Sequence, residues 1–257
     1  MTTYPPFSWP AGRRGAVCLC WDDSDASQLD FALPILAEFG LRATFYVLPD
    51  QVERRLSDWQ AALAAGHEIG NHTVRHPCSG NYSWQSAASM VEGYTYEQME
   101  AEIRQANATL HRLLGQTPTS FAYCCGLTFV GRGRAVRSYV PLIADLFTVG
   151  RVYGNVSHCR PACCDLAQVW GMGMDNQSFS WIQARIDACC DAGGWLTLVG
   201  HTVGTTNRLT VTPDTLRRLC DYLARQPEIW TDTVTTVGNY VRAQQDPSLR
   251  ATPETGA

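Results

Sequence analysis

Short apolar runs alternate along the chain with segments whose apolar positions recur at helical spacing. Such runs, about four to eight residues long, are typical of strands buried on both faces, and helical segments between them would cover those faces. We predict strands at residues 16–21, 43–48, 67–70, 120–125, 147–149, 167–170, 195–199 and 231–234. We predict helices at residues 29–39, 57–65, 96–114, 135–146, 181–192, 213–225 and 237–245. The alternation indicates parallel strands joined by helical crossovers.

The number of strand–helix units indicates how the sheet is arranged. About seven such units in 257 residues favour a closed, TIM-like barrel over an open sheet. No internal repeat and no linker divides the chain, and the last patterned segment ends near residue 245. We therefore expect an α/β fold, a single distorted (β/α)7–8 barrel over residues 1–245, followed by a loose tail over residues 246–257.

Polar residues cluster at the ends of the predicted strands. Asp22 and Asp23 follow the first strand, His72 follows the third, residues 123–126 end the fourth, and His201 follows the strand at 195–199. The C-terminal ends of parallel barrel strands meet on one rim, where barrel enzymes build their active sites. These side chains are therefore expected to lie close together.

The spacing of His72 and His76 is compatible with metal binding. Imidazoles four residues apart can converge on one ion, although two hydrogen-bonded surface histidines would show the same spacing. The carboxylates of Asp22 and Asp23 and the imidazole of His201 favour the metal interpretation, because the predicted strands bring them to the same rim.

Composition and charge narrow the classes of partner. The chain is 45% hydrophobic with a formal net charge of -4 and no basic tract, so it lacks the usual footprint for nucleic acid or an anionic membrane. We expect a small-molecule or oligosaccharide substrate, with no nucleic-acid or membrane partner and no signal for an oligomeric state. Residues 1–16 lack the apolar core of a signal peptide, and no apolar run would span a bilayer. A cytoplasmic location is therefore expected.

The chain has 11 cysteines, six of them in three adjacent pairs. In a cytoplasmic protein the usual state of cysteine is the thiol, buried as a small apolar side chain. A second metal site would be conceivable at His158, Cys159, Cys163 and Cys164, but this segment has no CxxC spacing, which disfavours the idea.

Four motifs resemble those of a known family when taken in chain order. They are Trp-Asp-Asp-Ser at 21–24, the histidine-rich stretch at 66–76, Phe-Ala-Tyr-Cys-Cys-Gly at 121–126, and Leu-Val-Gly-His at 198–201. In this order they are similar to the successive motifs of the polysaccharide deacetylase family, also called carbohydrate esterase family four. The resemblance covers roughly residues 15–240 and identifies the chain as a divergent member.

The resemblance implies a ligand set for one divalent metal. Asp23, His72 and His76 would bind zinc, with cobalt, manganese, nickel and iron as alternatives. Two imidazoles and one carboxylate agree with this implication, because three protein ligands with open positions are typical of catalytic rather than structural zinc sites.

The resemblance also implies catalytic roles. Asp22 would be the general base that takes a proton from metal-activated water, and His201 the general acid that protonates the leaving amine. Family members hold this histidine with an acidic residue, for which Asp175 is the candidate. A turn residue would also fit the loop position of Asp175.

Substrate contacts are expected from the loops of the rim. The resemblance implies that a backbone N–H of the fourth-strand motif, that of Cys125, binds the oxyanion. We expect Tyr123, Asn176 and Trp84 to contact substrate, with the segment 79–84 covering the metal. Simple core or loop packing is the more common role for an aromatic residue such as Trp84.

The chain departs from the family pattern at the fourth strand. Ala122 stands where an arginine normally pairs with the base aspartate, and Cys124 replaces a proline. Asp22 therefore needs another cationic partner, for which Arg75 and Arg42 are candidates.

Three functions remain open from the sequence. The first is a metal-dependent hydrolase that removes an acetyl group from an acetamido sugar or related N-acyl compound. The second is a cyclic amide or imide hydrolase of the allantoin type, since some proteins of this fold open such rings. The third is a non-catalytic barrel that binds carbohydrate or metal, which would need neither Asp22 as base nor His201 as acid.

Overall fold

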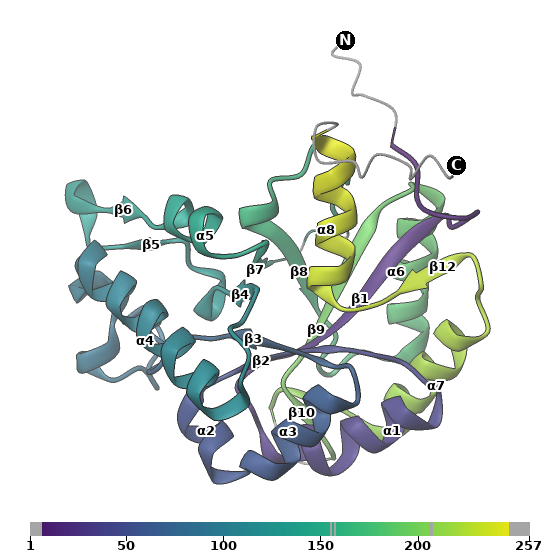
Figure 1. Cartoon of the computed structure of the whole chain (residues 1–257), viewed down its shortest axis with the longest axis horizontal. Helices are drawn as coiled ribbons and strands as arrows, with labels where there is room; N and C mark the ends of the chain where they lie inside the picture. Colours follow the sequence, from purple (N-terminus) through teal and green to yellow (C-terminus); the bar gives the residue numbers. More distant parts are fainter. Residues whose placement is uncertain (1–6, 155, 157, 206–207, 247–257) are drawn as a thin grey trace, which may run out of the picture.

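The computed structural model describes residues 7–154, 156, 158–205 and 208–246. Within them seven parallel strands close into a barrel, in the order β1-β2-β3-β4-β7-β8-β9, and β9 pairs back with β1 (Figure 1). These strands are β1 (Gly15–Trp21), β2 (Thr44–Val47), β3 (Glu68–Asn71), β4 (Ser120–Ala122), β7 (Val149–Tyr153), β8 (Val169–Gly173) and β9 (Trp195–Gly200). The predicted barrel of parallel strands is confirmed.

The remaining strands lie outside the seven-stranded barrel. β12 (Ile229–Thr231) pairs in parallel with the first half of β1, beside the part that pairs with β2. Two short pairs flank the rim: antiparallel β5 (Phe129–Val130) and β6 (Arg137–Ser138), and parallel β10 (Thr202–Val203) and β11 (Thr210–Val211).

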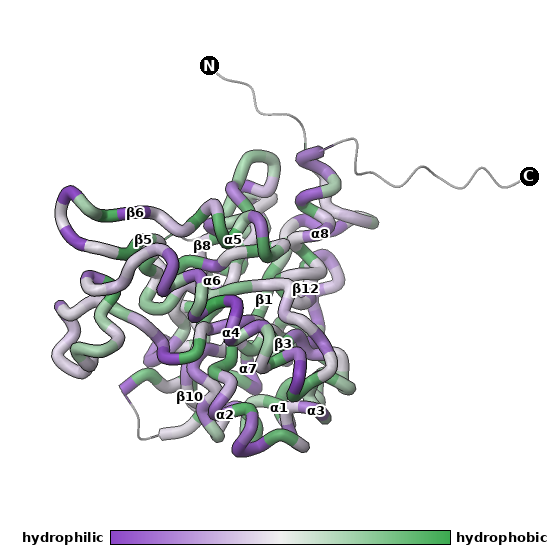
Figure 2. The backbone as a smooth tube through the Cα atoms, turned by 60° about the vertical axis from the view of Figure 1, so that its left-hand side comes forward, coloured by the Kyte–Doolittle hydropathy of each residue, from purple (hydrophilic) through white to green (hydrophobic). Residues whose placement is uncertain are grey.

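Helices surround the barrel (Figure 1). They are α1 (Leu33–Glu38), preceded by a π-helical turn (Gln28–Ala32), α2 (Pro49–Arg54), α3 (Leu56–Ala64), α4 (Tyr96–Leu114), α5 (Val140–Leu146), α6 (Phe179–Asp191), α7 (Pro213–Ala224) and α8 (Val234–Gln245). No helix of the described residues is both long and apolar enough to cross a membrane. Hydrophobic and hydrophilic residues alternate along the outer helices, as the coloured tube through α8 shows (Figure 2).

The predicted and observed elements differ in several places. The helix predicted at 135–146 begins only at Val140, because Pro141 is tolerated in the first turn of a helix but not in its interior. The strand predicted at 231–234 ends at Thr231, and the Thr233 side chain caps α8 by accepting a hydrogen bond from the Thr236 amide, 3.3 Å away. The short helix α2 was not predicted. The tail predicted from residue 246 lies outside the described residues from 247 onward.

The buried strands pack against two different sets of residues. Along β1, Val17, Leu19 and Trp21 belong to the cluster under the outer helices, whereas Ala16, Cys18 and Cys20 belong to a second cluster. That second cluster contains Val234, Val237 and Val241 of α8. Successive side chains of a strand point to opposite faces. Because apolar clusters cover both faces of β1, its sequence is a continuous hydrophobic run.

Gly150 provides a test of how tightly β7 packs. A Cβ atom at this position would lie 2.4 Å from the Ala167 carbonyl oxygen and 2.6 Å from Ile143 Cγ2. We expect Gly150→Ala to lower the free energy of unfolding by about 1–3 kcal/mol, because a backbone oxygen cannot move aside easily. Chemical denaturation measures this change. Gly93→Ala is the matched control, since a Cβ there meets nothing within 4 Å; equal stability of both variants would contradict the packing argument.

Candidate active site

The C-terminal ends of the barrel strands surround a cavity of about 880 Å³. Several residues predicted for the site line this cavity: Asp22, Asp23, His72, His76, Trp84, Tyr123, Cys125 and His201. The expectation that the strand ends gather these residues on one rim is therefore confirmed by their positions.

The three residues predicted as metal ligands lie together. Asp23 Oδ1 is 3.3 Å from His72 Nε2 and 3.5 Å from His76 Nε2. His72 Nδ1 lies 2.9 Å from the Ala122 carbonyl oxygen. A carbonyl only accepts, so Nδ1 carries a proton and donates it there, and Nε2 is the ring nitrogen that faces Asp23.

This arrangement fits a divalent cation. Asp23 Oδ1 is buried and has no hydrogen-bond partner among the described residues, although it faces two imidazole nitrogens. Burial and, after it, the neighbouring His72 lower the pKa of His76 to about 4, so the His76 imidazole is neutral at pH 7. A buried carboxylate oxygen and two imidazole nitrogens are the donors that a catalytic zinc site uses.

Cys124 lies behind the histidine pair. Its Sγ is 3.9 Å from His72 Nδ1, and it forms with His72 and His76 the one group of three potential ligands found among the described residues. Because Nδ1 is the protonated nitrogen, the thiol contacts the back of the ring and Asp23 remains the third candidate ligand. His158, Cys159, Cys163 and Cys164 do not converge into such a group.

The candidate base, Asp22, pairs with an arginine that the sequence did not suggest. Arg151 Nη2 donates to both carboxylate oxygens of Asp22, at 2.5 and 2.6 Å, and its guanidinium carbon lies 5.0 Å from the centre of the Tyr46 ring. Burial lowers the pKa of the Arg151 guanidinium, but the charge of Asp22 outweighs this effect and the pKa is raised. The guanidinium therefore stays charged.

The proposed substitutes for the missing family arginine are wrong. Arg75 pairs with Glu102, and Arg42 pairs with Asp232 at 3.2 Å. Arg151 escaped prediction because the predicted fifth strand ended at residue 149, whereas β7 continues to Tyr153. The available signal was an arginine inside the apolar run Val-Gly-Arg-Val-Tyr, since a charge there needs a buried partner.

The candidate acid, His201, contacts the acidic residue predicted for it. His201 Nδ1 lies 2.6 Å from Asp175 Oδ2, and the His201 amide donates to Asp175 Oδ1 at 3.1 Å. Burial lowers the pKa of the imidazole, but the hydrogen bond to Asp175 and the negative charge of Asp22 outweigh burial and raise it. Asp175 is 8% exposed, so its carboxylate acts on the imidazole with little screening.

The predicted substrate contacts divide into two groups. Cys125 and Trp84 line the cavity, and Trp84 is 57% exposed and stacks with Tyr82 at 5.4 Å between ring centres. Tyr123 also lines it, but its hydroxyl donates to the Ala167 carbonyl 2.9 Å away. Asn176 does not line the cavity, because its side-chain amide bonds the Arg208 carbonyl. The predicted contact of Asn176 with substrate therefore has no support from the cavity lining and stays a prediction.

The expectation that the cysteines are all thiols is also wrong. Cys78 and Cys125, 47 residues apart, form a disulfide. Cys78 follows the His76 turn, whereas Cys125 follows β4 and has a left-handed φ of 53°. The bond ties the segment that carries Tyr82 and Trp84 to the rim of β4. Closure of the barrel brings these two loops side by side. Their separation in the sequence gives no indication of this contact.

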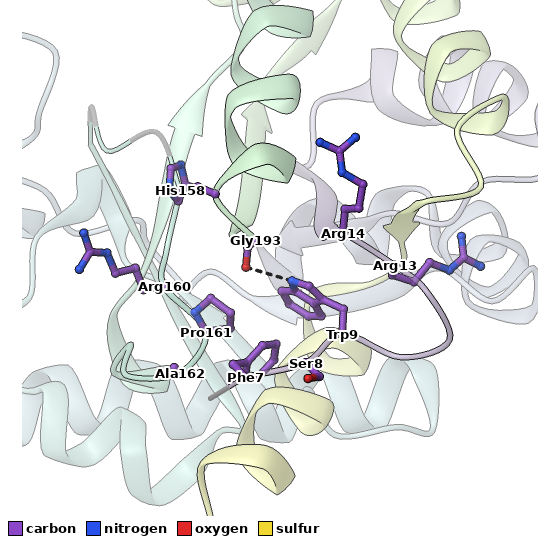
Figure 3. Close-up of a pocket in the computed structure, with 11 residues that line it drawn as sticks. Phe7, Ser8, Trp9, Arg13, Arg14, His158, Arg160, Pro161, Ala162 and Gly193 are labelled. Atoms are coloured by element: carbon purple, nitrogen blue, oxygen red, sulfur yellow. Dashed lines mark hydrogen bonds between the residues drawn. The ribbon is translucent and has the colours of Figure 1, made fainter. Parts of the chain in front are cut away.

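A second concavity, of about 660 Å³, lies at the opposite end of the barrel (Figure 3). Trp9 Nε1 donates to the Gly193 carbonyl there at 3.0 Å. Two of its arginines are held by other parts of the chain, since Arg14 pairs with Asp191 and Arg13 donates to the Ile229 carbonyl at 3.1 Å. The candidate catalytic residues all lie on the other rim, so the chemistry is assigned to the larger cavity.

Comparison with known sequences relates part of the chain to a known family. Residues 10–135 match the sequence model of polysaccharide deacetylases. This part of the chain belongs to the polysaccharide deacetylase family. Among curated proteins, a gellan lyase from Bacillus sp is 25% identical over 118 residues, which are 46% of this chain and 4% of that protein. The chain thus matches a small part of that relative's length.

Solved structures share the fold at low sequence identity. A Mycobacterium smegmatis protein assigned as a polysaccharide deacetylase has a TM-score of 0.68 and 17% identity, covering 100% of this chain and 98% of its own. The PuuE allantoinase has a TM-score of 0.66 and 13% identity, covering 91% and 92%. A family 4 acetyl xylan esterase from Clostridium thermocellum, in complex with a cobalt ion, has a TM-score of 0.57 and 20% identity, covering 91% and 95%. Such identities establish a common fold alone.

The disulfide gives a test of the rim. Reduction by dithiothreitol should lower the melting temperature, because releasing a loop closed by residues 47 apart costs about 4 kcal/mol in the chain-entropy description. Thermal unfolding with and without reductant measures the shift, and Cys78→Ser with Cys125→Ser should remove the response. Cys163→Ser, at an exposed free cysteine, is the control. Labelling of all 11 cysteines in denatured, unreduced protein would contradict the bond.

Proposed function

We propose that this protein is a metal-dependent hydrolase that removes an acetyl or related acyl group from an amide nitrogen. The proposed substrate is an acetamido sugar or a related N-acyl compound. One observation supports this proposal most strongly. Three residues that could bind a divalent cation, a carboxylate held by a buried arginine, and a histidine–carboxylate pair all lie on one rim of the barrel. Asp22, Asp23 and His201 all line the same cavity.

Asp23, His72 and His76 would hold the metal. A divalent metal bound there supplies Lewis acidity, polarising a carbonyl and making water acidic enough to lose a proton near neutral pH. Zinc suits two imidazoles and one carboxylate, with cobalt, manganese, nickel and iron as alternatives. The polysaccharide deacetylases are generally metal-dependent, and the cobalt ion in the acetyl xylan esterase structure supports the assignment.

Asp22 would act as the general base. Arg151 takes one lone pair on each of its oxygens, which leaves further lone pairs free to accept a proton. The same hydrogen bonds fix the orientation of the carboxylate towards the cavity, so no reorganisation is needed when the proton is transferred.

His201 would act as the general acid. Its Nδ1 is occupied by Asp175, so Nε2 remains to deliver a proton to the leaving amine. The raised pKa of His201 keeps a larger fraction of the imidazole protonated near neutral pH. A general acid must carry a proton, whereas a metal-binding nitrogen must not. This difference distinguishes the role of His201 from that of His76.

The walls of the cavity support a carbohydrate substrate. Its volume of about 880 Å³ lies within the usual range of small-molecule sites. The stacked rings of Tyr82 and Trp84, 46% and 57% exposed, would give the apolar face of a sugar ring a flat surface beside His76. The Cys125 amide would bind the oxyanion. The Cys78–Cys125 disulfide favours an oxidising compartment over the cytoplasm expected from the sequence.

A cyclic imide hydrolase is the second candidate. The fold is shared with an allantoinase at a TM-score of 0.66, and a ring amide presents the same carbonyl and leaving nitrogen to the base and the acid. A barrel that only binds ligand is less well supported, because such a barrel would need neither the buried Asp22–Arg151 pair nor the His201–Asp175 pair.

Substrate and base can be tested together. Purified protein with added zinc should release acetate from N-acetylglucosamine oligomers, and Asp22→Asn should keep its zinc while losing about 100- to 10,000-fold in kcat. Asp30→Asn, on the outer surface, is the control. Consumption of a cyclic imide instead of the oligomers would favour the second candidate. Zinc binding without turnover of either compound would favour the binding-only barrel, and unchanged turnover in Asp22→Asn would refute the base.

The pH profile tests His201. Because the acid must be protonated, activity should fall as the pH rises through the His201 pKa, and the raised pKa places this fall above the ordinary range for histidine. Asp175→Asn removes the carboxylate that raises the pKa, so the alkaline limb of kcat/KM should move to lower pH. A profile with an unmoved alkaline limb would show that Asp175 does not tune the acid.

A further inference from the structure

A buried carboxylate of α4 contacts the back of the turn that carries the two histidines. Glu102 is 2% exposed. Its Oε2 accepts hydrogen bonds from the Val74 and Arg75 amides, at 3.1 and 3.2 Å. These two amides lie between His72 and His76 in the chain, and none of the roles described above uses Glu102.

The turn between the histidines has a conformation that needs external support. Thr73 and His76 both adopt left-handed φ angles, of 65° and 51°, which residues other than glycine rarely occupy. The Thr73 amide donates to Asn71 Oδ1 at 2.7 Å, and the His76 amide donates to Thr73 Oγ1 at 3.0 Å. The two amides in the middle of the turn depend on Glu102 for their acceptor.

The second oxygen of Glu102 is also occupied. Oε1 accepts from Arg75 Nε and from the Tyr94 hydroxyl, the latter at 3.2 Å. The Arg75 side chain is 62% exposed, so solvent screens this ion pair. The backbone hydrogen bonds to Oε2 are therefore the contacts that reach the turn itself, and the ion pair with Arg75 balances the buried charge.

The two histidines are anchored differently. His72 is held by the Ala122 carbonyl through its own Nδ1. Within the part of the chain that the structure describes, no comparable hydrogen bond holds the His76 ring, and its Nε2 reaches Asp23 because the turn returns the chain towards the end of β1. A change in the conformation of the turn would therefore displace the His76 ring more than the His72 ring.

We propose that Glu102 is a positioning residue for the metal centre. By accepting both central amides, its carboxylate holds the left-handed turn in the form that aims His76 Nε2 at Asp23 and His72. The proposal rests on the metal-dependent function proposed above, and it adds to that function a residue that touches neither metal nor substrate. Loss of the carboxylate should weaken metal binding before it affects the chemistry of the bound substrate.

The test is zinc affinity, measured by competition with a chromophoric chelator on the full chain. Glu102→Ala should weaken zinc binding about 10- to 100-fold, the usual effect of losing a residue that orients a ligand. Glu102→Gln should lose less, because its carbonyl oxygen still accepts a hydrogen bond from an amide. Glu100→Gln is the matched control, since Glu100 lies on the same helix in an exposed pair with Arg104. It should bind zinc as the unmodified protein does.

Arg75→Met separates positioning from the ion pair. This variant removes the charge partner of Glu102 but keeps the Arg75 backbone amide, so zinc affinity should change by less than about threefold. A loss as large as that of Glu102→Ala would overturn the proposal. Unchanged zinc affinity in folded Glu102→Ala and Glu102→Gln, with only a lowered melting temperature, would likewise overturn it and assign Glu102 a purely structural role.

The readout does not depend on turnover. If the unmodified protein binds zinc, loses affinity on Glu102 substitution and yet hydrolyses no substrate, the positioning role stands and the proposed reaction fails. If the unmodified protein binds neither zinc nor any of the alternative divalent metals named above, both proposals fail. Cobalt absorption spectra of the loaded variants provide a second measure, because a displaced His76 should change the visible bands that report coordination geometry.

Discussion

One buried ion pair constrains the rest of the structure. Arg151 is fully buried and Asp22 is 4% exposed, so either charge without the other would carry a desolvation cost of several kcal/mol. Asp22 directly follows β1 and Arg151 lies in β7, and these two strands are not neighbours in the sheet. They meet across the interior only when the barrel has closed, and the Tyr46 ring then packs against the guanidinium. The ion pair that stabilises the closed barrel therefore also places a carboxylate, with a fixed orientation, at the mouth of the cavity.

The adjacent aspartates can perform different tasks because the backbone changes direction between them. Asp22 is directed at Arg151, whereas Asp23 has a φ of 71° and turns its oxygen towards the histidines. Left-handed residues other than glycine concentrate in the same loops. Among the described residues, six of the seven follow barrel strands at the rim: Asp23, Ser24, Thr73, His76, Cys125 and Asn176. Such strain persists only where neighbouring contacts hold it, and α4 and the Cys78–Cys125 disulfide supply two of these contacts.

The parts of the site that could be predicted are those encoded by local pattern. Apolar runs located the strands, and the residues just after them, Asp22, Asp23, His72 and His201, had to share a rim because parallel barrel strands end on one side. Arg151 was missed because it enters from the interior of a strand, where no local rule reveals its partner. The direction of the Asn176 side chain could not be predicted for a related reason, since a position in the sequence next to Asp175 does not decide which way a side chain points from a left-handed turn.

The sequence by itself determined the alternation of strands and helices, the rim on which the chemistry gathers, and the identity of the residues able to bind a metal or move a proton. Periodicity and strand ends are local properties, and nearest-neighbour sterics and burial are enough to impose them. Only the tertiary structure decided that Arg151 neutralises Asp22, that Cys78 joins Cys125, and that Glu102 supports the histidine turn. These pairs are separated by 129, 47 and 27–28 residues. Their contacts arise from closure of the barrel and the docking of α4, which no spacing along the chain encodes.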